Sequence, residues 1–392
     1  MPDSTPIALR ELTTIRVGGV PERMLTATTQ RDLVDIALQV WGSGDDWLLL
    51  GGGSNTVASD EPFDGTVIRI ATRGVEVLPQ ASAPGLVRVR VQAGEPWDDL
   101  VAYTVGRGWA GLEALSGIPG LAGAAPIQNI GAYGQEISNT LVAVDFLDYA
   151  SGEVERLTVA ELELGYRTSV IKQGRHGVVV SIELELHDTA VQRDVLGEAL
   201  GQPIAYAQLA STLGAQLGDR LPISAVRDAV LTLRASKGMV LDADDPDTWS
   251  AGSFFTNPIV REGFARSLPA DAPRWPLTED APDVIEPLHA PALDPWAAAQ
   301  VALAPPARPA EPEPRLVKLS AAWLIEQSGI RRGFGLPGSH AAISSKHTLA
   351  ITTRGEATGD EIAQLARYVR GRVQAEFGVI LQPEPVIIGL EV

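Results

Sequence analysis

Three side chains from distant parts of the sequence could perform acid–base chemistry together. Ser253 stands between a glycine and two phenylalanines, Arg167 follows a tyrosine, and Glu384 lies between two prolines. A serine nucleophile needs a basic partner and an orienting acid, but none of the five histidines lies in a recognisable triad motif. We therefore expect Ser253 to donate a proton to a strongly basic carbon rather than to attack.

Arg167 and Glu384 each have an ordinary structural interpretation as well. A Tyr-Arg pair is common at protein surfaces, and a glutamate between prolines can simply end a strand. A planar guanidinium can, however, bind a carboxylate through two hydrogen bonds, which lysine cannot do. The two prolines would hold the Glu384 carboxylate at one angle, because each fixes its own backbone φ.

Glycine-rich loops recur in the first third of the chain. The first, Gly51-Gly-Gly-Ser-Asn55, follows a predicted strand, but Thr56 stands where a dinucleotide-binding fingerprint requires glycine, and no Gly-Lys-Ser/Thr tail of a P-loop follows. Its unhindered amides could still approach a pyrophosphate. Two further runs, 116–120 and 128–134, offer more free amides. Each loop alone is a weak signal, whereas three together favour a large bound ligand.

Composition excludes several functional classes. The chain has 392 residues, enough for two or three domains, and a formal net charge of −18, which disfavours nucleic acid as a partner. It contains no cysteine, and its histidines lack metal-ligand spacing, so we expect no metal. The N-terminus lacks a signal-peptide pattern, and no apolar run reaches about 18 residues. We expect a cytoplasmic protein without membrane insertion.

Periodic patterns predict helices and strands around these motifs. Capping boxes at Thr29 and Thr358 predict helices from there, the second ending at Gly378. Strands are predicted at 47–50, 66–70, 87–91, 182–186, 379–381 and 386–388, and a helix end near 234–237. Residues 269–314 contain 12 of the 28 prolines and show no period, which predicts an exposed, mobile insertion.

With these motifs, nearly the whole chain resembles the flavoenzyme family of UDP-N-acetylenolpyruvoylglucosamine reductases, a branch of the vanillyl-alcohol-oxidase-like flavoproteins. The resemblance implies an α+β protein of three subdomains, two of which clasp FAD while the third is an α+β substrate-binding domain. The implied divisions are residues 1–71 completed by the tail 381–392, then 72–190, a connector 191–237, and 238–380 with the insertion 269–314.

The resemblance also implies a reaction. NADPH would reduce FAD, and the reduced flavin would then convert UDP-N-acetylglucosamine enolpyruvate to UDP-N-acetylmuramate for peptidoglycan. Arg167 and Glu384 would stabilise the charge that develops on the substrate carboxylate, and Ser253 would protonate the adjacent carbon. A glutamate that faces a carboxylate needs either protonation or a bridging cation to avoid repulsion, so we expect a raised pKa for Glu384. A monomer is expected.

Further residues are assigned by the same resemblance. Contacts to the substrate are expected from Tyr166, Tyr206, which closes over the nucleotide in one subclass, Arg234, Lys237, Asn257 and Gln327. The residues expected to line FAD are Gly51, Gly52, Gly53, Ser54, Asn55, Ser116, Gly117, Ile118, Pro119, Gly120, Gly123, Ala124, Gln128, Asn129, Gly131, Ala132, Tyr133 and Gly134.

Two other functions also fit part of this pattern, and the chain departs from the family in places. A flavin oxidase of the same fold, acting on another alcohol, often attaches its flavin to histidine or cysteine, and this chain has no cysteine. A UDP-sugar-binding protein that has lost catalysis would not need all three acid–base residues. The family also places an arginine near the flavin two residues after the glutamate, whereas this chain has Val386, so either another group substitutes for it or the flavin potential shifts.

Overall fold

The computed structural model describes residues 5–79, 81–277 and 315–392. The N-terminal part is a three-stranded parallel sheet with the order β1-β4-β2, against which helix α1 packs. Helix α1 begins at the predicted capping box of Thr29 and Asp32 and ends at Gly44 in the left-handed conformation. The elements of this part are β1 Pro21–Ala27, α1 Gln30–Ser43, β2 Trp47–Leu50, β3 Thr56–Ala58 and β4 Phe63–Ile70.

The middle part is a larger sheet with the order β11-β10-β12-β6-β5, in which β7 also pairs with β12. Val89 and Ile182 bury one face of the sheet, as their alternation predicts. On the other face Glu183 is only 4% exposed, because Arg88, Arg90 and Arg156 all pair with its carboxylate. The elements are β5 Val75–Leu78, β6 Leu86–Gln92, α2 Trp97–Arg107, β7 Trp109–Ala110, β8 Gly131–Ala132, β9 Gln135–Glu136, β10 Leu141–Asp148, β11 Val154–Thr158, α3 Val159–Leu162 and β12 Gly177–Asp188.

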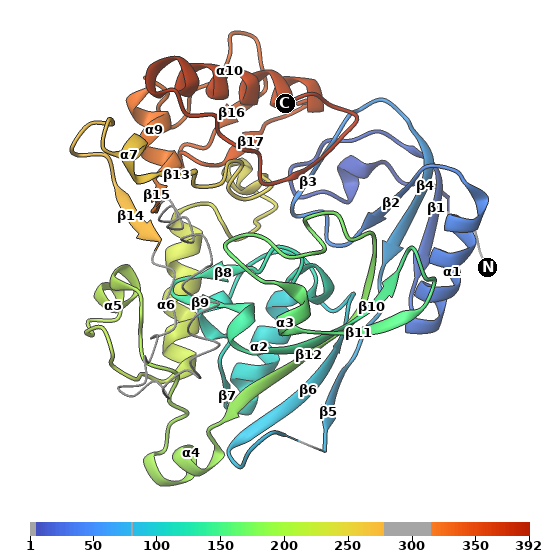
Figure 1. Ribbon diagram of the computed structural model, residues 1–392, viewed down its shortest axis with the longest axis vertical. Coiled ribbons are helices and arrows are strands. Elements are labelled where there is room, and N and C mark those ends of the chain that lie inside the picture. The colour runs from blue at the N-terminus through green and yellow to red at the C-terminus, as the bar shows by residue number, and fades with distance from the viewer. Residues whose placement is uncertain (1–4, 80, 278–314) are drawn as a thin grey trace, which may run out of the picture.

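Three helices, α4 Ala190–Leu196, α5 Ala207–Thr212 and α6 Ile223–Ser236, connect the middle part to the C-terminal part. Helix α6 packs against both α2 and α5, and Figure 1 shows it running along one side of the molecule. Its C-cap is Lys237, so Arg234 and Lys237 lie at the predicted helix end.

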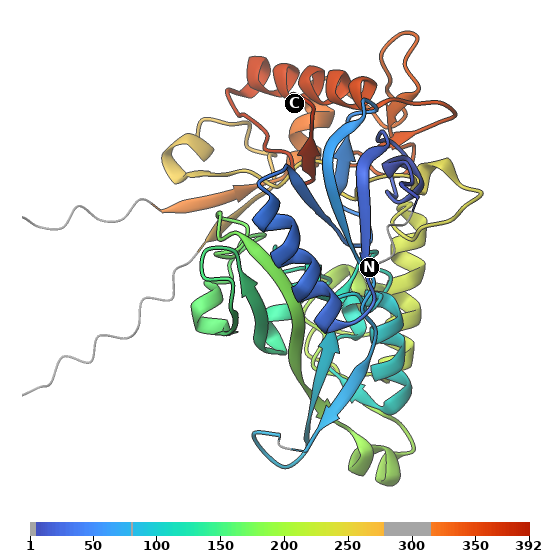
Figure 2. The same ribbon diagram turned by 90° about the vertical axis from the view of Figure 1, so that its right-hand side faces the viewer.

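The C-terminal part combines an antiparallel sheet of order β13-β15-β14, a β16-β17 hairpin and the long helix α10. Helix α10 begins at the predicted capping box of Thr358 and Glu361 and ends at Gly378, and Figure 2 shows it across the top of the molecule. The elements are β13 Ile259–Arg261, α7 Glu262–Ala265, β14 Arg274–Leu277, β15 Leu316–Leu319, α9 Ala321–Gln327, β16 Ala341–Ile343, β17 Ile351–Thr353, α10 Gly359–Phe377 and β18 Val386–Ile388.

Two predictions about this part need correction. Residues 274–277, inside the predicted mobile insertion, form strand β14 on β15, where Pro276 is accommodated because β14 is an edge strand. The remainder of that prediction, residues 278–314, lies outside the described residues. The predicted strand 379–381 does not form: Val379 and Leu381 are buried in the C-terminal core, but the segment pairs with no strand among the described residues.

The last strand returns to the beginning of the chain. Strand β18 pairs in parallel with β3, so that Val386 lies opposite Thr56. Immediately before it, residues 382–384 run beside 254–256, with hydrogen bonds from Glu384 N to Phe254 O (2.9 Å) and from Thr256 N to Gln382 O (3.0 Å). The tail therefore joins the N-terminal and C-terminal parts. In the ranges that the structure describes, no helix is long and apolar enough to cross a membrane.

Candidate active site

A cavity of about 380 Å³ lies where the three parts meet, and we call it the main cavity. This volume is within the range of small-molecule sites. Its wall contains all three acid–base residues predicted from the sequence, Ser253, Arg167 and Glu384. Of the residues predicted to line FAD, it contains Gly51, Gly52, Gly53, Ser54, Asn55, Ile118, Pro119, Gly120, Gly123, Ala124, Gln128 and Gly131.

The first two glycine loops contact each other so closely that side chains are excluded. A Cβ added to Gly52 would lie 2.9 Å from the Cα of Gly120, and Gly53 has φ 60° with its Cβ position blocked by the carbonyl of Leu12. Ser54 Oγ donates a hydrogen bond to Pro119 O (3.0 Å), which fixes the two loops together. The wall here is bare backbone, which allows a ligand's phosphates to approach the amide groups.

The structure brings the predicted acid–base residues together from three segments. Arg167 Nε lies 3.6 Å from Glu384 Oε1, in an ion pair whose side chains are 24% and 13% exposed. Ser253 precedes Phe254, whose carbonyl accepts the hydrogen bond from Glu384 N. The Ser253 segment and the Glu384 segment are therefore direct neighbours, although 130 residues separate them in the chain.

Burial and the nearby cations shift the pKa of Glu384 in opposite directions. Burial raises the pKa of Glu384, as expected from the sequence, while the cations Arg167 and Lys172 oppose that rise. Burial lowers the pKa of Lys172, with Glu384 opposing the change. Together with Arg234, these residues give the main cavity three cations and one acid. This local positive charge favours an anionic ligand in a chain whose net charge is −18.

Lys172 is a cavity residue to which the sequence analysis assigned no role. Its Nζ donates to Gln128 Oε1 at 3.1 Å, and Asn55 Nδ2 lies 3.4 Å from the same oxygen. Asn55 Nδ2 also lies 3.4 Å from Glu384 O, so these side chains form one network along the wall. The short turn 169–172 holds Lys172 at this position, because Lys172 N donates a hydrogen bond to Ser169 Oγ (3.2 Å).

Tyr166, one of the residues predicted to contact the substrate, links two parts of the molecule. Burial raises the pKa of Tyr166, and hydrogen bonding from Asn257 opposes that rise. The Lys318 ammonium lies 4.7 Å from the centre of the Tyr166 ring. The structure therefore brings Tyr166 and Asn257 together, one from the middle part and one from the C-terminal part, next to Arg167.

The other predicted substrate residues gather around the end of α6, with one exception. Arg234 lines the main cavity, and its Nε is buried without a hydrogen-bond partner among the described residues. Tyr206 packs edge-on against Tyr133, with 5.6 Å between the ring centres, and Lys237 Nζ lies 5.4 Å from the Tyr133 ring. Gln327 is exposed at the end of α9 and is not part of the cavity wall.

Comparison with known proteins agrees with this geometry. Residues 21–158 match the family described as FAD binding domain, and residues 244–388 match the C-terminal domain of UDP-N-acetylenolpyruvoylglucosamine reductase. The UDP-N-acetylenolpyruvoylglucosamine reductase of Leifsonia xyli subsp. xyli is 60% identical over 98% of this chain and 99% of its own length. The chain belongs to this reductase family. The reductase of Salinispora arenicola is 44% identical over 97% of the chain and 94% of its own length.

The fold is that of the reductase family as well. The crystal structure of UDP-N-acetylenolpyruvylglucosamine reductase from Thermus caldophilus superposes with a TM-score of 0.59, at 22% sequence identity, over 98% of each chain. The main cavity also fits the FAD of this family on its own features. The bare backbone at Gly52 and Gly120 forms a cradle that a Cβ would fill.

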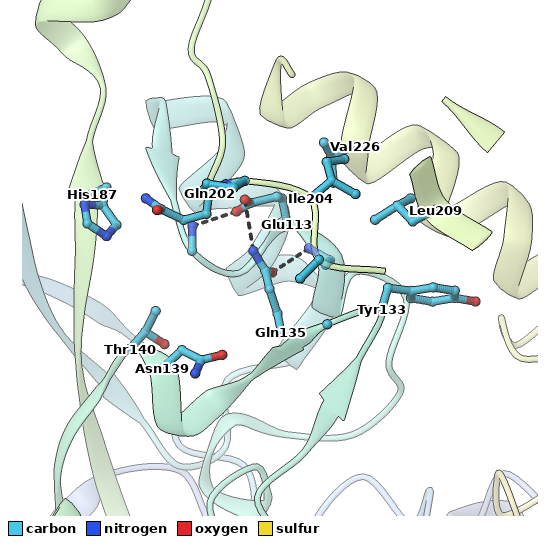
Figure 3. Close-up of a pocket in the computed structure, with 15 residues that line it drawn as sticks. Glu113, Tyr133, Gln135, Asn139, Thr140, His187, Gln202, Ile204, Leu209 and Val226 are labelled. Carbon is cyan, nitrogen blue, oxygen red and sulfur yellow. Dashed lines mark hydrogen bonds between the residues drawn. The ribbon is translucent and has the colours of Figure 1, made fainter. Parts of the chain in front are cut away.

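Six residues predicted to line FAD lie outside the main cavity wall. Tyr133 and Gly134 line a second cavity of about 250 Å³, shown in Figure 3. Its buried Glu113 accepts hydrogen bonds from Gly111 N (2.6 Å) and Gln135 Nε2 (3.0 Å), so that carboxylate is already engaged by the protein. The other four are Ser116, Gly117, Asn129 and Ala132.

Three of those four residues make hydrogen bonds to other groups of the protein. Ser116 is buried and donates to Glu113 O (2.7 Å), and Gly117 N donates to Asp98 Oδ1 (2.6 Å). Asn129 is 2% exposed, and its side chain donates hydrogen bonds to Glu136 and to the carbonyl of Gly165. Within the described part of the chain, no group of three histidine, aspartate or glutamate side chains could hold a metal ion.

Proposed function

We propose that this chain uses NADPH and FAD to reduce UDP-N-acetylglucosamine enolpyruvate to UDP-N-acetylmuramate, a precursor of peptidoglycan. The observation that carries the proposal is the meeting of Ser253, Arg167 and Glu384 on the wall of one cavity whose glycine loops are bare backbone. These loops would hold FAD, which would supply the transfer of a hydride from NADPH to the terminal methylene carbon of the enolpyruvyl group.

The protein's part in the reaction begins with the substrate carboxylate. As the methylene carbon gains a hydride, negative charge spreads from the adjacent carbon into that carboxylate. Arg167 can hold it with two N–H groups, and Glu384, whose pKa is raised by burial, can donate a hydrogen bond in its neutral form. Stabilising charge that develops only in the transition state lowers the barrier directly.

Ser253 completes the addition across the double bond. Its hydroxyl would give a proton to the carbon that bears the carboxylate, while the O–H bond breaks and the new C–H bond forms. The serine then regains a proton from water before the next turnover. Phe254 and Phe255, each 1% exposed, belong to the C-terminal core and fix the backbone that carries Ser253.

The cations at the end of α6 suit the charged end of the substrate. Burial lowers the pKa of Arg234 and Lys237 because it disfavours their charged forms. Both would hold the diphosphate, since a bound anion offsets that cost. Tyr206, 43% exposed at the start of a short helix, would cover the nucleotide. Tyr166 and Asn257 would contact the enolpyruvyl end, where they adjoin Arg167.

The cellular setting is part of the proposal. We assign the enzyme to the cytoplasm as a monomer, in the pathway that supports cell-wall formation and so cell shape and division. We also propose the division into residues 1–71 with the tail 381–392, 72–190, a connector 191–237, and 238–380. The pairing of β18 with β3 supports the assignment of the tail to the first subdomain.

An absorbance spectrum tests the proposed function directly. Purified protein should be yellow, with flavin bands that NADPH bleaches under anaerobic conditions. Adding the enolpyruvyl substrate should restore the colour and form one UDP-N-acetylmuramate per flavin. Recolouring by oxygen but not by this substrate would favour an oxidase, and a folded, colourless protein would favour a binding protein.

A further inference from the structure

The guanidinium of Arg167 is held in place by main-chain carbonyls of one loop. Arg167 Nη1 donates to Asn129 O (3.2 Å), and Nη2 donates to Gly131 O (2.7 Å). Arg167 itself has φ 54°, a conformation that a non-glycine residue rarely adopts. Because two of its nitrogens bond to this loop, the direction of the guanidinium depends on the conformation of residues 129–131.

Asn129 ties that loop to the backbone around Arg167. The residue is 2% exposed, and its Nδ2 donates both to Glu136 Oε2 (2.8 Å) and to Gly165 O (3.1 Å). Its Oδ1 accepts from Ser138 N (3.2 Å). Asn129 therefore binds the Arg167 guanidinium through its main-chain carbonyl, and it binds the backbone of Gly165 through its side chain.

Glu136 accepts a hydrogen bond from Asn129 and so fixes the position of the Asn129 side chain. Strands β8 and β9 pair Gly131 with Glu136. Glu136, which accepts the hydrogen bond from Asn129, therefore lies opposite Gly131, which accepts the hydrogen bond from Arg167 Nη2. A carboxylate acceptor makes a stronger hydrogen bond than a neutral one. The contact is also shielded, because Asn129 is almost fully buried.

We propose that Asn129 and Glu136 are positioning residues that set the orientation of Arg167 toward the substrate carboxylate. This inference rests on the proposed function of Arg167. Neither side chain needs to touch the substrate or the cofactor for this role. Displacing a positioned group by about 1 Å can slow a reaction up to about 100-fold.

The decisive variant is Asn129→Asp. Aspartate has nearly the same shape and tolerates the φ of 43° at this position, but it has no N–H for Gly165 O and places a carboxylate against Glu136. We expect FAD reduction by NADPH to change less than about threefold, while substrate turnover by the reduced enzyme slows about 10- to 100-fold. Affinity for the enolpyruvyl substrate should fall, whereas affinity for UDP-N-acetylglucosamine, which lacks the carboxylate, should not.

Matched variants separate positioning from general loss of structure. Glu136→Gln keeps an acceptor for Asn129, so substrate turnover should slow no more than about threefold. Added to the Asn129→Asp protein, the same change supplies an N–H to the new carboxylate and should restore part of the lost turnover rate. Ser138→Ala keeps the backbone N–H that bonds to Asn129 and removes only the longer contact from Ser138 Oγ to Glu136 Oε2 (3.4 Å), so it should slow substrate turnover less than about threefold. If Asn129→Asp retains no FAD, Glu136→Ala replaces it, with an expected slowing of about five- to tenfold in the same half-reaction only.

The outcomes distinguish this inference from the function on which it rests. If Arg167→Ala slows substrate turnover but neither Asn129→Asp nor Glu136→Ala does, the positioning role is wrong. Equal loss in both half-reactions, or equal loss of affinity for both nucleotide sugars, would likewise overturn it. If Arg167→Ala leaves substrate turnover unchanged, the proposed function of Arg167 fails instead.

Discussion

Acidification from pH 7 to pH 4 should destabilise this protein in part through His347, which lies in the loop between β16 and β17. Burial is the main reason that its pKa is lowered from 6.5 to about 4. The cations Lys237, Arg234 and Arg332 lower the pKa further, and Glu326 opposes them. Protonating His347 in the folded protein therefore places a charge in a buried, already positive environment.

The sign and size of the effect follow from linkage. Above pH 6.5 the imidazole is neutral in the folded and the unfolded chain, so it contributes no pH dependence. Between pH 6.5 and 4 the unfolded chain binds the proton and the folded chain does not, so the free energy of unfolding falls as the pH falls. A difference of about 2.5 pKa units corresponds to about 3 kcal/mol. For a chain of this length that unfolds in one step, this is roughly 4 °C in melting temperature.

Thermal melting at half-unit steps between pH 4 and pH 7.5 measures this effect, as the difference between the parent protein and His347→Gln. Over this range the melting temperature of the parent should fall by about 4 °C more than that of the variant. His187→Gln, at an exposed position, is the matched control and should leave the parent curve unchanged. Parallel curves for the parent and His347→Gln would refute the reasoning, because they would mean that His347 protonates equally in both states.

Three further predictions concern the main cavity. Ser253→Ala should leave flavin reduction by NADPH near normal and slow substrate turnover by about 10²- to 10⁴-fold, and stopped-flow absorbance resolves the two steps. Arg167→Lys keeps the charge but loses the planar fork, so substrate affinity should fall at least about tenfold while FAD content per protein stays constant. Gly52→Ala should reduce FAD content, because its methyl group would meet Gly120 at 2.9 Å, whereas Gly42→Ala, with open space around it, should not.

Local sequence signals predicted the elements whose ends are determined locally. The helices at Thr29 and Thr358 were predicted correctly because a capping box involves only neighbouring residues. Strand β14 was missed because its partner β15 lies about 40 residues later and Pro276 argues against a strand. The segment 379–381 was wrongly predicted as a strand, since apolar side chains can be buried without any strand pairing.

The sequence also predicted only part of the candidate site. Motifs identified Ser253, Arg167 and Glu384, and the structure places them on one cavity wall. Nothing in the sequence indicated that the Asn129 side chain bonds to neighbouring loops, because an amide can serve a ligand or a loop equally well. Lys172 was overlooked because its contact with Gln128 depends on a fold that joins residues 44 positions apart.

The pairing of β3 with β18 also has a consequence for how the protein is made on the ribosome. Residues 56–58 emerge early, yet their partner strand at 386–388 follows more than 300 residues later. At about 5–20 residues per second, this interval lasts roughly 16–65 s. Because β3 pairs with β18 alone among the described strands, its backbone N–H and C=O groups have no strand partner during that time. Newly translated copies should therefore benefit from chaperones until synthesis has passed residue 388.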